Sequence, residues 1–396
     1  MNRRELLYSG TALTAMAAGS MTARSYASIL GANDRVGLGV IGLGRRGTIV
    51  SNAFAQDPRV QILALCDVYD EQAKQFEGHL KAHLSQPALS VRYQELLSRG
   101  NVDAVLIATP DHLHVQVAKD ALGAGKNIYL EKPTLHHWSD RAALVQAASA
   151  NKTILQCGMQ QRSGAHYLRA KEEIFAARKL GDVVLVRAVW SNFSWQRRNI
   201  LSEPKPASLN WELFLGSAPH VPYQTARYSS WRSYRDYGGG LLADILTHWV
   251  DVAQWMLDDA HPVTASALGG IYQLHNGCEN PDTVSAIIQY KNWNLNFESS
   301  VLSIHGDHPS VFFEGTKGTL NITREGYAFT PNDGAQLKVD SAQDLEQAHT
   351  KNFIDAIVLG NKVNAPLFAG LDATLPVQMA LHSYWSHKIT TAADLV

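Results

Sequence analysis

The sequence predicts an α/β protein with a doubly wound parallel sheet, followed by an α+β domain that contains a large, mostly antiparallel sheet. Apolar strand-like segments alternate with helical patterns from about residue 36 to 157, which is typical of parallel sheets covered by helices on both faces. A glycine-rich G-x-G-x-x-G sequence follows the first strand-like segment and precedes the first helical one. From residue 263 to 330, strand-like segments follow one another with only turns between them.

The elements of the first half follow from hydrophobic periodicity. Short runs rich in Val, Ile and Leu predict strands at 36–41, 60–66, 102–108, 127–130 and 153–157. Amphipathic patterns between them predict helices at 48–56, 69–84, 113–124 and 139–150, the last with Ser139 as N-cap. This half is expected to form a domain over residues 34–157.

The second half, residues 158–396, is expected to form a separate domain. A helix at 165–179 leads into a strand at 183–189, and an irregular stretch rich in Trp, Pro and Tyr follows, from 190 to 237. Three glycines at 238–240 open a helix that is expected to reach about residue 257. Two more helices are expected near the C-terminus, at 342–359 and 370–388.

Composition narrows the classes of function. The 396-residue chain has 35 Lys and Arg against 36 Asp and Glu, so its formal net charge is −1 and it lacks the basic excess of a nucleic-acid-binding protein. Its three cysteines, Cys66, Cys157 and Cys278, are far apart and form no C-x-x-C pair. We therefore expect neither a zinc ribbon nor a disulfide framework.

The N-terminus has the layout of an export signal. Arg3 and Arg4 precede a weakly apolar run, and Ser25-Tyr26-Ala27 gives a small-x-small cleavage pattern. The paired arginines favour the twin-arginine route, which carries folded proteins. We expect residues 1–27 to be a signal peptide and the protein to be periplasmic, with no membrane span after signal removal; an ordinary amphipathic helix and an uncleaved anchor are the alternatives.

The glycine-rich loop is the first candidate binding site, with the sequence Gly42-Leu43-Gly44-Arg45-Arg46-Gly47. It stands between a predicted strand and a predicted helix, the context that the dinucleotide-binding fingerprint of a Rossmann domain requires. Gly42 would permit a tight turn, Gly44 would let the backbone approach a pyrophosphate, and Gly47 would allow close packing of helix on strand. The alternative is a glycine turn without a ligand.

Asp67 lies twenty residues after Gly47, at the end of the second predicted strand. A carboxylate there accepts hydrogen bonds from the adenosine ribose and repels a 2′-phosphate, which favours NAD over NADP. Arg45 and Arg46 favour NADP instead, because a nearby arginine can bind the 2′-phosphate.

Three further segments give the sequence a family resemblance. They are Thr109-Pro110-Asp111-His112-Leu113-His114 after the strand at 102–108, Glu131-Lys132-Pro133 after the strand at 127–130, and Gly238 to Asp251, which contains Asp244 and His248. In this order they resemble the Gfo/Idh/MocA oxidoreductase family, and the second half resembles its exported branch. The resemblance implies NAD as cofactor, with Thr109, Pro110, His114 and Glu131 near it, and a homo-oligomer formed through the open face of the antiparallel sheet.

The resemblance also implies catalytic residues. Lys132 would lie beside the nicotinamide ribose and donate to the reacting hydroxyl, with a turn at Pro133 that is expected to be cis. Asp244 and His248 are four residues apart on a helix and share a face; His248 would accept the hydroxyl proton, and Asp244 would hold the substrate or orient the histidine. A metal half-site and a purely structural polar pair are the alternatives, and we expect no metal.

A carbohydrate substrate is expected because aromatic rings stack on the apolar C–H faces of sugars. Candidate substrate residues are Trp190, Trp195, Trp231 and Arg162, although such aromatics also fill cores. The leading hypothesis is hydride transfer between a sugar or glycoside hydroxyl, at C3 in the exported branch, and tightly bound NAD, with a partner lyase or hydrolase acting on the 3-keto product. The alternatives are a sugar sensor without activity and a glycosidase that oxidises and then reduces its substrate. The known glycosidases of this kind replace the lysine of the E-K-P motif, which this chain keeps as Lys132.

Overall fold

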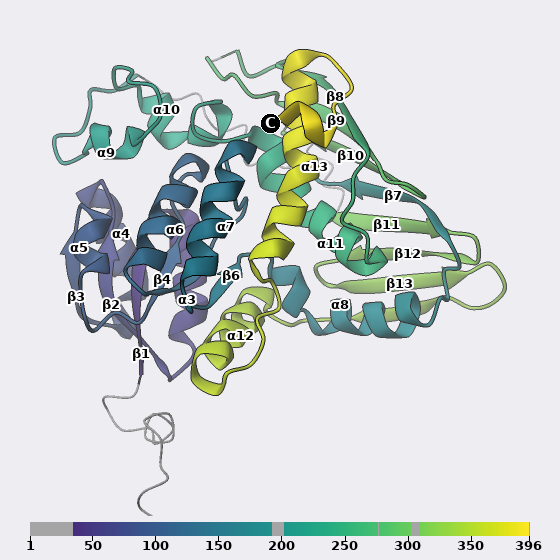
Figure 1. Cartoon of the computed structure of the whole chain (residues 1–396), viewed down its shortest axis with the longest axis horizontal. Coiled ribbons are helices and arrows are strands. Elements are labelled where there is room, and N and C mark those ends of the chain that lie inside the picture. Colours follow the sequence, from purple (N-terminus) through teal and green to yellow (C-terminus); the bar gives the residue numbers. More distant parts are fainter. Residues whose placement is uncertain (1–34, 192–201, 276, 302–308, 396) are drawn as a thin grey trace, which may run out of the picture.

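The computed structural model describes residues 35–191, 202–275, 277–301 and 309–395. Two sheets lie side by side, each with its own set of helices, and the C-terminal helices run between them (Figure 1). The proposed signal peptide, residues 1–27, and Trp195 fall outside the described residues.

The N-terminal sheet has six parallel strands in the order β3-β2-β1-β4-β5-β6, the order of a dinucleotide-binding Rossmann fold. Its strands are β1 (Val36–Ile41), β2 (Val60–Cys66), β3 (Leu84–Ser90), β4 (Ala104–Ile107), β5 (Asn127–Leu130) and β6 (Leu155–Cys157). The helices of this half are α3 (Arg45–Ala55), α4 (Asp70–Leu80), α5 (Tyr93–Leu97), α6 (His114–Gly123) and α7 (Arg141–Ala150). Strands β1 and β4 are buried along their whole length, as expected for central parallel strands. The prediction of a parallel sheet is confirmed.

One strand was not predicted. The helix expected at 69–84 ends at Leu80, and the chain turns into β3, which pairs only with β2. Pro87 makes this segment look unlike a strand in the sequence, because proline lacks the N–H donor that a β-ladder needs. At the open edge of a sheet, that missing donor costs little.

The second sheet has eight strands in the order β14-β13-β12-β11-β7-β10-β9-β8. They are β7 (Val183–Val189), β8 (Thr264–Gly270), β9 (Thr283–Gln289), β10 (Asn294–Ser300), β11 (Ser310–Gly315), β12 (Gly318–Thr323), β13 (Gly326–Pro331) and β14 (Leu337–Asp340). All neighbours are antiparallel except β7 and β10, so the expected mostly antiparallel sheet is confirmed. Along β9, buried and exposed residues alternate, which shows that one face packs on the core and the other faces outward.

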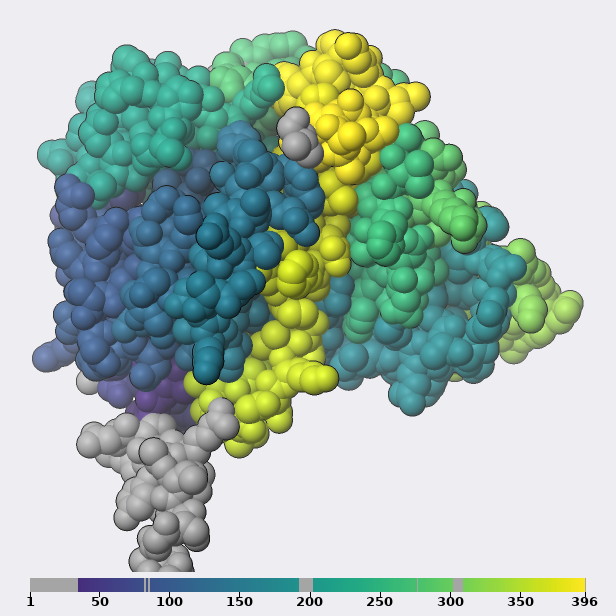
Figure 2. Space-filling view, in the orientation of Figure 1, coloured from purple at the N-terminus to yellow at the C-terminus, as the bar shows by residue number. Residues whose placement is uncertain are grey.

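Helices α8 (Ala165–Ala170), α11 (Thr247–Leu257) and α13 (Leu367–Ser386) cover one side of this sheet (Figure 1). Helix α12 (Leu345–Leu359) instead packs on α3, where Phe353 meets Phe54 edge-on at 6.0 Å between ring centroids. The C-terminal helices therefore belong to both halves, and the space-filling view shows them wedged between the two (Figure 2). Within the described ranges, no helix has the length and apolar character to cross a membrane.

Candidate functional site

The glycine-rich loop has the geometry that its three glycines predict. Gly42 has φ +90°, and a Cβ there would lie 2.6 Å from the carbonyl oxygen of Ala108. A Cβ on Gly47 would lie 2.0 Å from the carbonyl oxygen of Gly42, so only glycine lets α3 approach β1 this closely. A Cβ on Gly44 would meet nothing within 4 Å, which leaves open space over the N-terminus of α3. A helix N-terminus facing open space is suited to a pyrophosphate.

Asp67 adjoins this loop at the end of β2. Its Oδ2 accepts a hydrogen bond from Leu43 N at 2.8 Å, and its Oδ1 accepts one from Tyr69 N at 3.0 Å. Burial raises the pKa of Asp67 to about 6, and the backbone N–H donors oppose that rise. The Asp67 carboxylate is thus bound directly to the glycine loop through Leu43 N.

Arg46 points away from Asp67. Its Nε donates to Glu131 Oε1 at 2.7 Å and its Nη1 to Glu346 Oε1 at 3.2 Å, whereas its Nη2 is buried and has no partner. Burial alone would lower the pKa of this guanidinium, but Glu131 and Glu346 raise it. The interpretation of Arg46 as a receptor for a 2′-phosphate therefore loses its support, because that side chain is held by two carboxylates. Arg45 is exposed.

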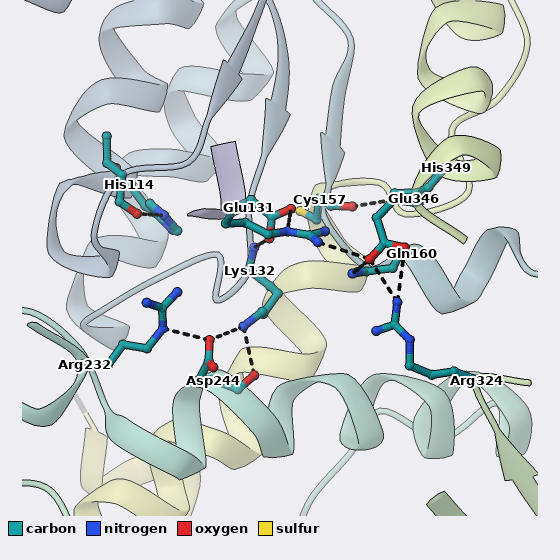
Figure 3. A network of polar contacts seen from close by, with 12 residues as sticks. His114, Glu131, Lys132, Cys157, Gln160, Arg232, Asp244, Arg324, Glu346 and His349 are labelled. Carbon is teal, nitrogen blue, oxygen red and sulfur yellow. Dashed lines mark hydrogen bonds and ion pairs between the residues drawn. The ribbon is translucent and has the colours of Figure 1, made fainter. Parts of the chain in front are cut away.

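Lys132 forms an ion pair with Asp244 across the two halves of the protein. Its Nζ donates to Asp244 Oδ1 at 2.5 Å and to the backbone oxygen of Asp244 at 2.9 Å, and Arg232 Nε donates to the same Oδ1 at 3.2 Å (Figure 3). Burial opposes ionisation of Asp244, but Lys132 and Arg232 together hold its pKa well below the usual range. Asp244 is therefore a carboxylate at neutral pH, and it fixes the ammonium group of Lys132. The Lys132–Pro133 peptide bond is cis.

His248 lies one turn beyond Asp244 on a helix that contains a π-helical turn, Leu242–Leu246. Such irregular turns recur at functional sites. Its side chain is buried, and its Nδ1 has no hydrogen-bond partner. Burial, together with the positive charges of Lys132 and Arg324, holds the pKa of His248 well below its usual value. His248 is therefore a neutral imidazole, and not the half-protonated group that its ordinary pKa suggests.

Two polar residues at this site were not predicted. Arg232 is the second cation on Asp244. Asp111 is buried, and burial raises its pKa to about 7, against the opposing effect of Arg232 and Lys132. Asp111 stands inside the Thr109–His114 segment, directly after Pro110, and this position was the only signal that could have found it.

The remaining predicted cofactor residues line the carboxyl ends of β4 and β5. The ring of His114 lies between two backbone oxygens, with Nδ1 2.7 Å from Pro133 O and Nε2 3.0 Å from Thr109 O. Burial lowers the pKa of His114 to about 4, so the ring is neutral and has a single N–H donor. It can donate to Pro133 O or to Thr109 O, and it therefore connects the loops after β4 and β5. The Oγ1 of Thr109 is buried without a partner.

The predicted substrate residues divide into two groups. Trp190 packs beside His248, with ring centroids 5.9 Å apart, and Arg232 stacks on Trp231 at 4.1 Å from the ring centroid. Arg162 instead donates through Nε to both oxygens of buried Asp251, at 2.8 and 3.0 Å. Arg162 and Asp251 thus hold each other in place through this ion pair. A substrate role for Arg162 stays a prediction.

The residues present fit a bound dinucleotide. Open space over Gly44, the Asp67 carboxylate and the N-terminus of α3 match the adenosine ribose and pyrophosphate. Three buried polar atoms of the site residues have no partner, namely Arg46 Nη2, Thr109 Oγ1 and His248 Nδ1. Such orphaned groups are consistent with a polar ligand that is bound in the working enzyme. In the described part of the chain, no group of three or more His, Cys, Asp or Glu residues is arranged to hold a metal ion.

Comparisons with known proteins agree with this geometry. Residues 36–159 match the model of an oxidoreductase family described as "NAD-binding Rossmann fold", and residues 167–321 match the "GFO/IDH/MocA C-terminal domain". A "Glycosyl hydrolase family 109 protein" of Streptomyces niveus is 39% identical over 103 residues, which are 25% of this chain and only 21% of that protein. An "Uncharacterized oxidoreductase YrbE" of Bacillus subtilis is 29% identical over 71% of this chain and 72% of its own length. A solved levoglucosan dehydrogenase in complex with NADH and levoglucosan has the same fold, with a TM-score of 0.72, 17% identity, and coverage of 90% of this chain and 99% of that one.

Proposed function

The chain belongs to the Gfo/Idh/MocA family of NAD-dependent oxidoreductases, and from this premise we propose that it transfers a hydride between a sugar or glycoside hydroxyl and NAD. The observation that carries the proposal is the ion pair of Lys132 with Asp244 next to neutral His248, at the carboxyl edge of the Rossmann sheet. Oxidation of an alcohol needs a donor to the reacting oxygen and an acceptor for its proton, and this arrangement supplies both.

Each protein group has a distinct task in this mechanism. Bound NAD supplies the carbon that accepts the hydride. Lys132 donates a hydrogen bond to the substrate oxygen and stabilises negative charge that develops there. Asp244 keeps Lys132 in place, and His248 accepts the hydroxyl proton, because one ring nitrogen of a neutral imidazole has a free lone pair.

A carbohydrate suits the walls of this site. Trp190 and Trp231 offer aromatic faces, whereas Asp111 and Arg232 offer polar groups that can pair with hydroxyls. The levoglucosan dehydrogenase of the same fold was solved in complex with NADH and levoglucosan. We extend the proposal to oxidation at C3 of a glycoside, which would acidify the neighbouring C–H bond for a partner lyase or hydrolase.

Two measurements test the proposal. Mass spectrometry of nucleotide released from the denatured, purified protein should detect NAD or NADH and not NADP. A panel of glycosides should then give a keto product with wild type, and Lys132→Ala should reduce kcat by about 10²- to 10³-fold while NAD stays bound. Nucleotide-free wild-type protein that turns over no glycoside with added NAD would refute the function, and unimpaired turnover by Lys132→Ala would refute the role of Lys132.

A glycosidase that uses NAD transiently is the second candidate, favoured by the 39% identity to the family 109 protein. Such an enzyme oxidises its substrate, eliminates the aglycone, adds water and reduces the product, so NAD is regenerated in every cycle. Chromogenic aglycone release without accumulation of NADH or keto sugar supports this candidate. Accumulation of the keto sugar with an intact glycosidic bond supports the dehydrogenase.

We further propose that the protein is exported through the twin-arginine route, which rests on Arg3 and Arg4 and on the pattern up to Ala27. An exported enzyme meets no pool of free nucleotide, so it would carry its NAD with it and recycle it on a second sugar or another acceptor. Fractionation of cells that express the full chain should place it outside the cytoplasm, and Arg3→Lys together with Arg4→Lys should retain it inside.

A further inference from the structure

A compact aromatic segment from the second half of the chain lies on the Rossmann domain, away from the eight-stranded sheet. We call residues 209–237 the aromatic strap; it contains α9 (Trp211–Leu215) and α10 (Thr225–Ser229). Both helices lie above the N-terminal half in Figure 1, and the strap rests on that half in the space-filling view (Figure 2). The strap has a hydrophobic core of its own, formed by Trp211, Phe214, Leu215, Tyr234 and Tyr237.

One end of the strap is attached just beyond β2. Asn210 N donates to Val68 O at 2.8 Å, and Tyr69 forms an isolated antiparallel bridge with Leu209. The ring of Tyr228 meets the ring of Tyr69 edge-on, with centroids 5.8 Å apart. This attachment begins one residue after Asp67, the proposed ribose ligand.

The other attachment is just beyond β4. His112 Nε2 lies 2.9 Å from Phe214 O, and the His112 ring packs against Phe214 and Tyr237 at centroid distances of 5.9 and 5.2 Å. Leu113 fills the space at Gly216, where a Cβ would lie only 2.5 Å from Leu113 Cδ2. This attachment follows Thr109 and Pro110 directly.

The order of strands determines what lies between the two attachments. In the sheet, β1 stands between β2 and β4, and β1 leads into the loop Gly42–Gly47. A segment anchored after β2 and again after β4 therefore spans the end of β1 at the crevice where dinucleotides bind. Burial raises the pKa of Tyr228, and the charge on Asp67 adds to that rise, which agrees with the strap reaching the ribose end of that crevice.

We propose that the aromatic strap is the outer wall of the adenosine subsite and that its two attachments control how slowly NAD leaves the enzyme. The inference rests on the proposed function for the identity of the ligand. The cofactor enters and leaves beneath the strap, so release requires one attachment to open. The strap carries out no chemical step. Its last part reaches the Lys132–Asp244 pair, where Arg232 Nε donates to Asp244 Oδ1 at 3.2 Å, but the proton transfer is assigned to Lys132 and His248.

Hydrogen exchange of the full chain, with and without saturating NAD, tests the location of the strap. We expect NAD to slow exchange in residues 209–237 as well as in the glycine loop, and to leave β9 and β10 unchanged. Protection of the glycine loop without any protection of the strap would overturn the proposal, although NAD binding itself would stand.

The release rate tests the attachment. Protein loaded with NADH is mixed with excess NAD, and the loss of bound-NADH fluorescence gives the dissociation rate. His112→Ala removes the contact with Phe214 O and both ring contacts, and we expect release to be at least tenfold faster, equivalent to about 1.4 kcal/mol. The matched control is His166→Ala, since His166 also lies against a backbone oxygen, Thr323 O at 3.1 Å, and against a tyrosine ring, but outside the strap.

Tyr228→Ala provides a second variant if His112→Ala does not fold, because it removes the ring contact with Tyr69 beyond β2, together with a ring contact to Phe214 inside the strap. It should also speed release, by several-fold, since the edge-on ring pair with Tyr69 is lost. Unchanged release in a folded variant of either position would overturn the strap proposal. Failure of wild type to bind any nicotinamide nucleotide would overturn the proposed function instead, so the two failures are distinguishable.

Discussion

Replacement of Glu131 by Gln removes the carboxylate that faces Arg46 and leaves the size of the side chain unchanged. The two side chains meet at 2.7 Å, and only 3% of the Glu131 side chain and 21% of the Arg46 side chain are exposed. Unit charges about 4 Å apart at an effective dielectric constant of about 20 attract each other by about 4 kcal/mol. Removal of one partner of a buried pair typically costs about 3–5 kcal/mol, because the other charge stays buried.

Thermal unfolding of the nucleotide-free protein measures this cost. For a chain of this size about 1 kcal/mol lowers Tm by about 2 °C, so Glu131→Gln should lower Tm by about 6–10 °C. The double variant Arg46→Met with Glu131→Gln leaves no unpaired charge and should recover part of the loss. A matched control is Glu173→Gln, which breaks an exposed ion pair of Arg169 at 2.9 Å and should change stability by less than about 1 kcal/mol.

The reasoning fails if Glu131→Gln changes Tm no more than the control, because the buried pair would then contribute no more than an exposed one. It also fails if the double variant is destabilised by the sum of the two single variants, because two groups that interact this closely cannot be independent.

Three further predictions concern the cofactor loop and the buried ion pair of Arg162 with Asp251. Burial raises the pKa of Asp67 to about 6, above the ordinary 3.8, so the favourable effect of its neutral form on folding is lost as pH rises through 6. NAD binding needs the ionised form, so the NAD affinity measured by titration should weaken by up to about tenfold per pH unit below 6. Asp67→Asn should flatten this pH dependence. Gly44→Val should keep the fold, since nothing lies within 4 Å of its Cβ position, but should abolish NAD binding measured by calorimetry, whereas Gly78→Val, equally free of neighbours, should bind normally. Arg162→Met should lower Tm by an amount similar to Glu131→Gln, because Asp251 is 1% exposed and would lose its cation; an unchanged Tm would show that the pair is not structural.

The fold could be predicted because its signals are local. The buried strands, the three glycines of the loop and Asp67 each follow from a pattern within about 30 residues of sequence, and the structure has the corresponding elements where they were expected. Strand β3 was missed because Pro87 and the lack of a long apolar run give no local signal, and only its pairing with β2 makes it a strand.

The site could be predicted only in part, because its electrostatics depend on contacts between distant segments. Arg46 looked like a candidate for a phosphate because its partners, Glu131 and Glu346, lie 85 and 300 positions away. His248 was expected to titrate near neutrality, but burial and two cations from other segments lower its pKa. No pattern within a single motif contains this information.

These long-range contacts share one consequence for the chemistry. Lys132 belongs to the Rossmann half, whereas its partner Asp244 and the proposed base His248 belong to the helix that packs on the second sheet. Arg162 holds the same helix one turn further on, through Asp251. The distance between the proton acceptor and the hydrogen-bond donor is therefore fixed by the packing of the two halves and by no single loop. Because about 1 Å of misplacement can cost a hundredfold in rate, we expect the ion pairs that hold this helix, Lys132–Asp244 between the halves and Arg162–Asp251 within the second half, to affect the rate of the proposed reaction.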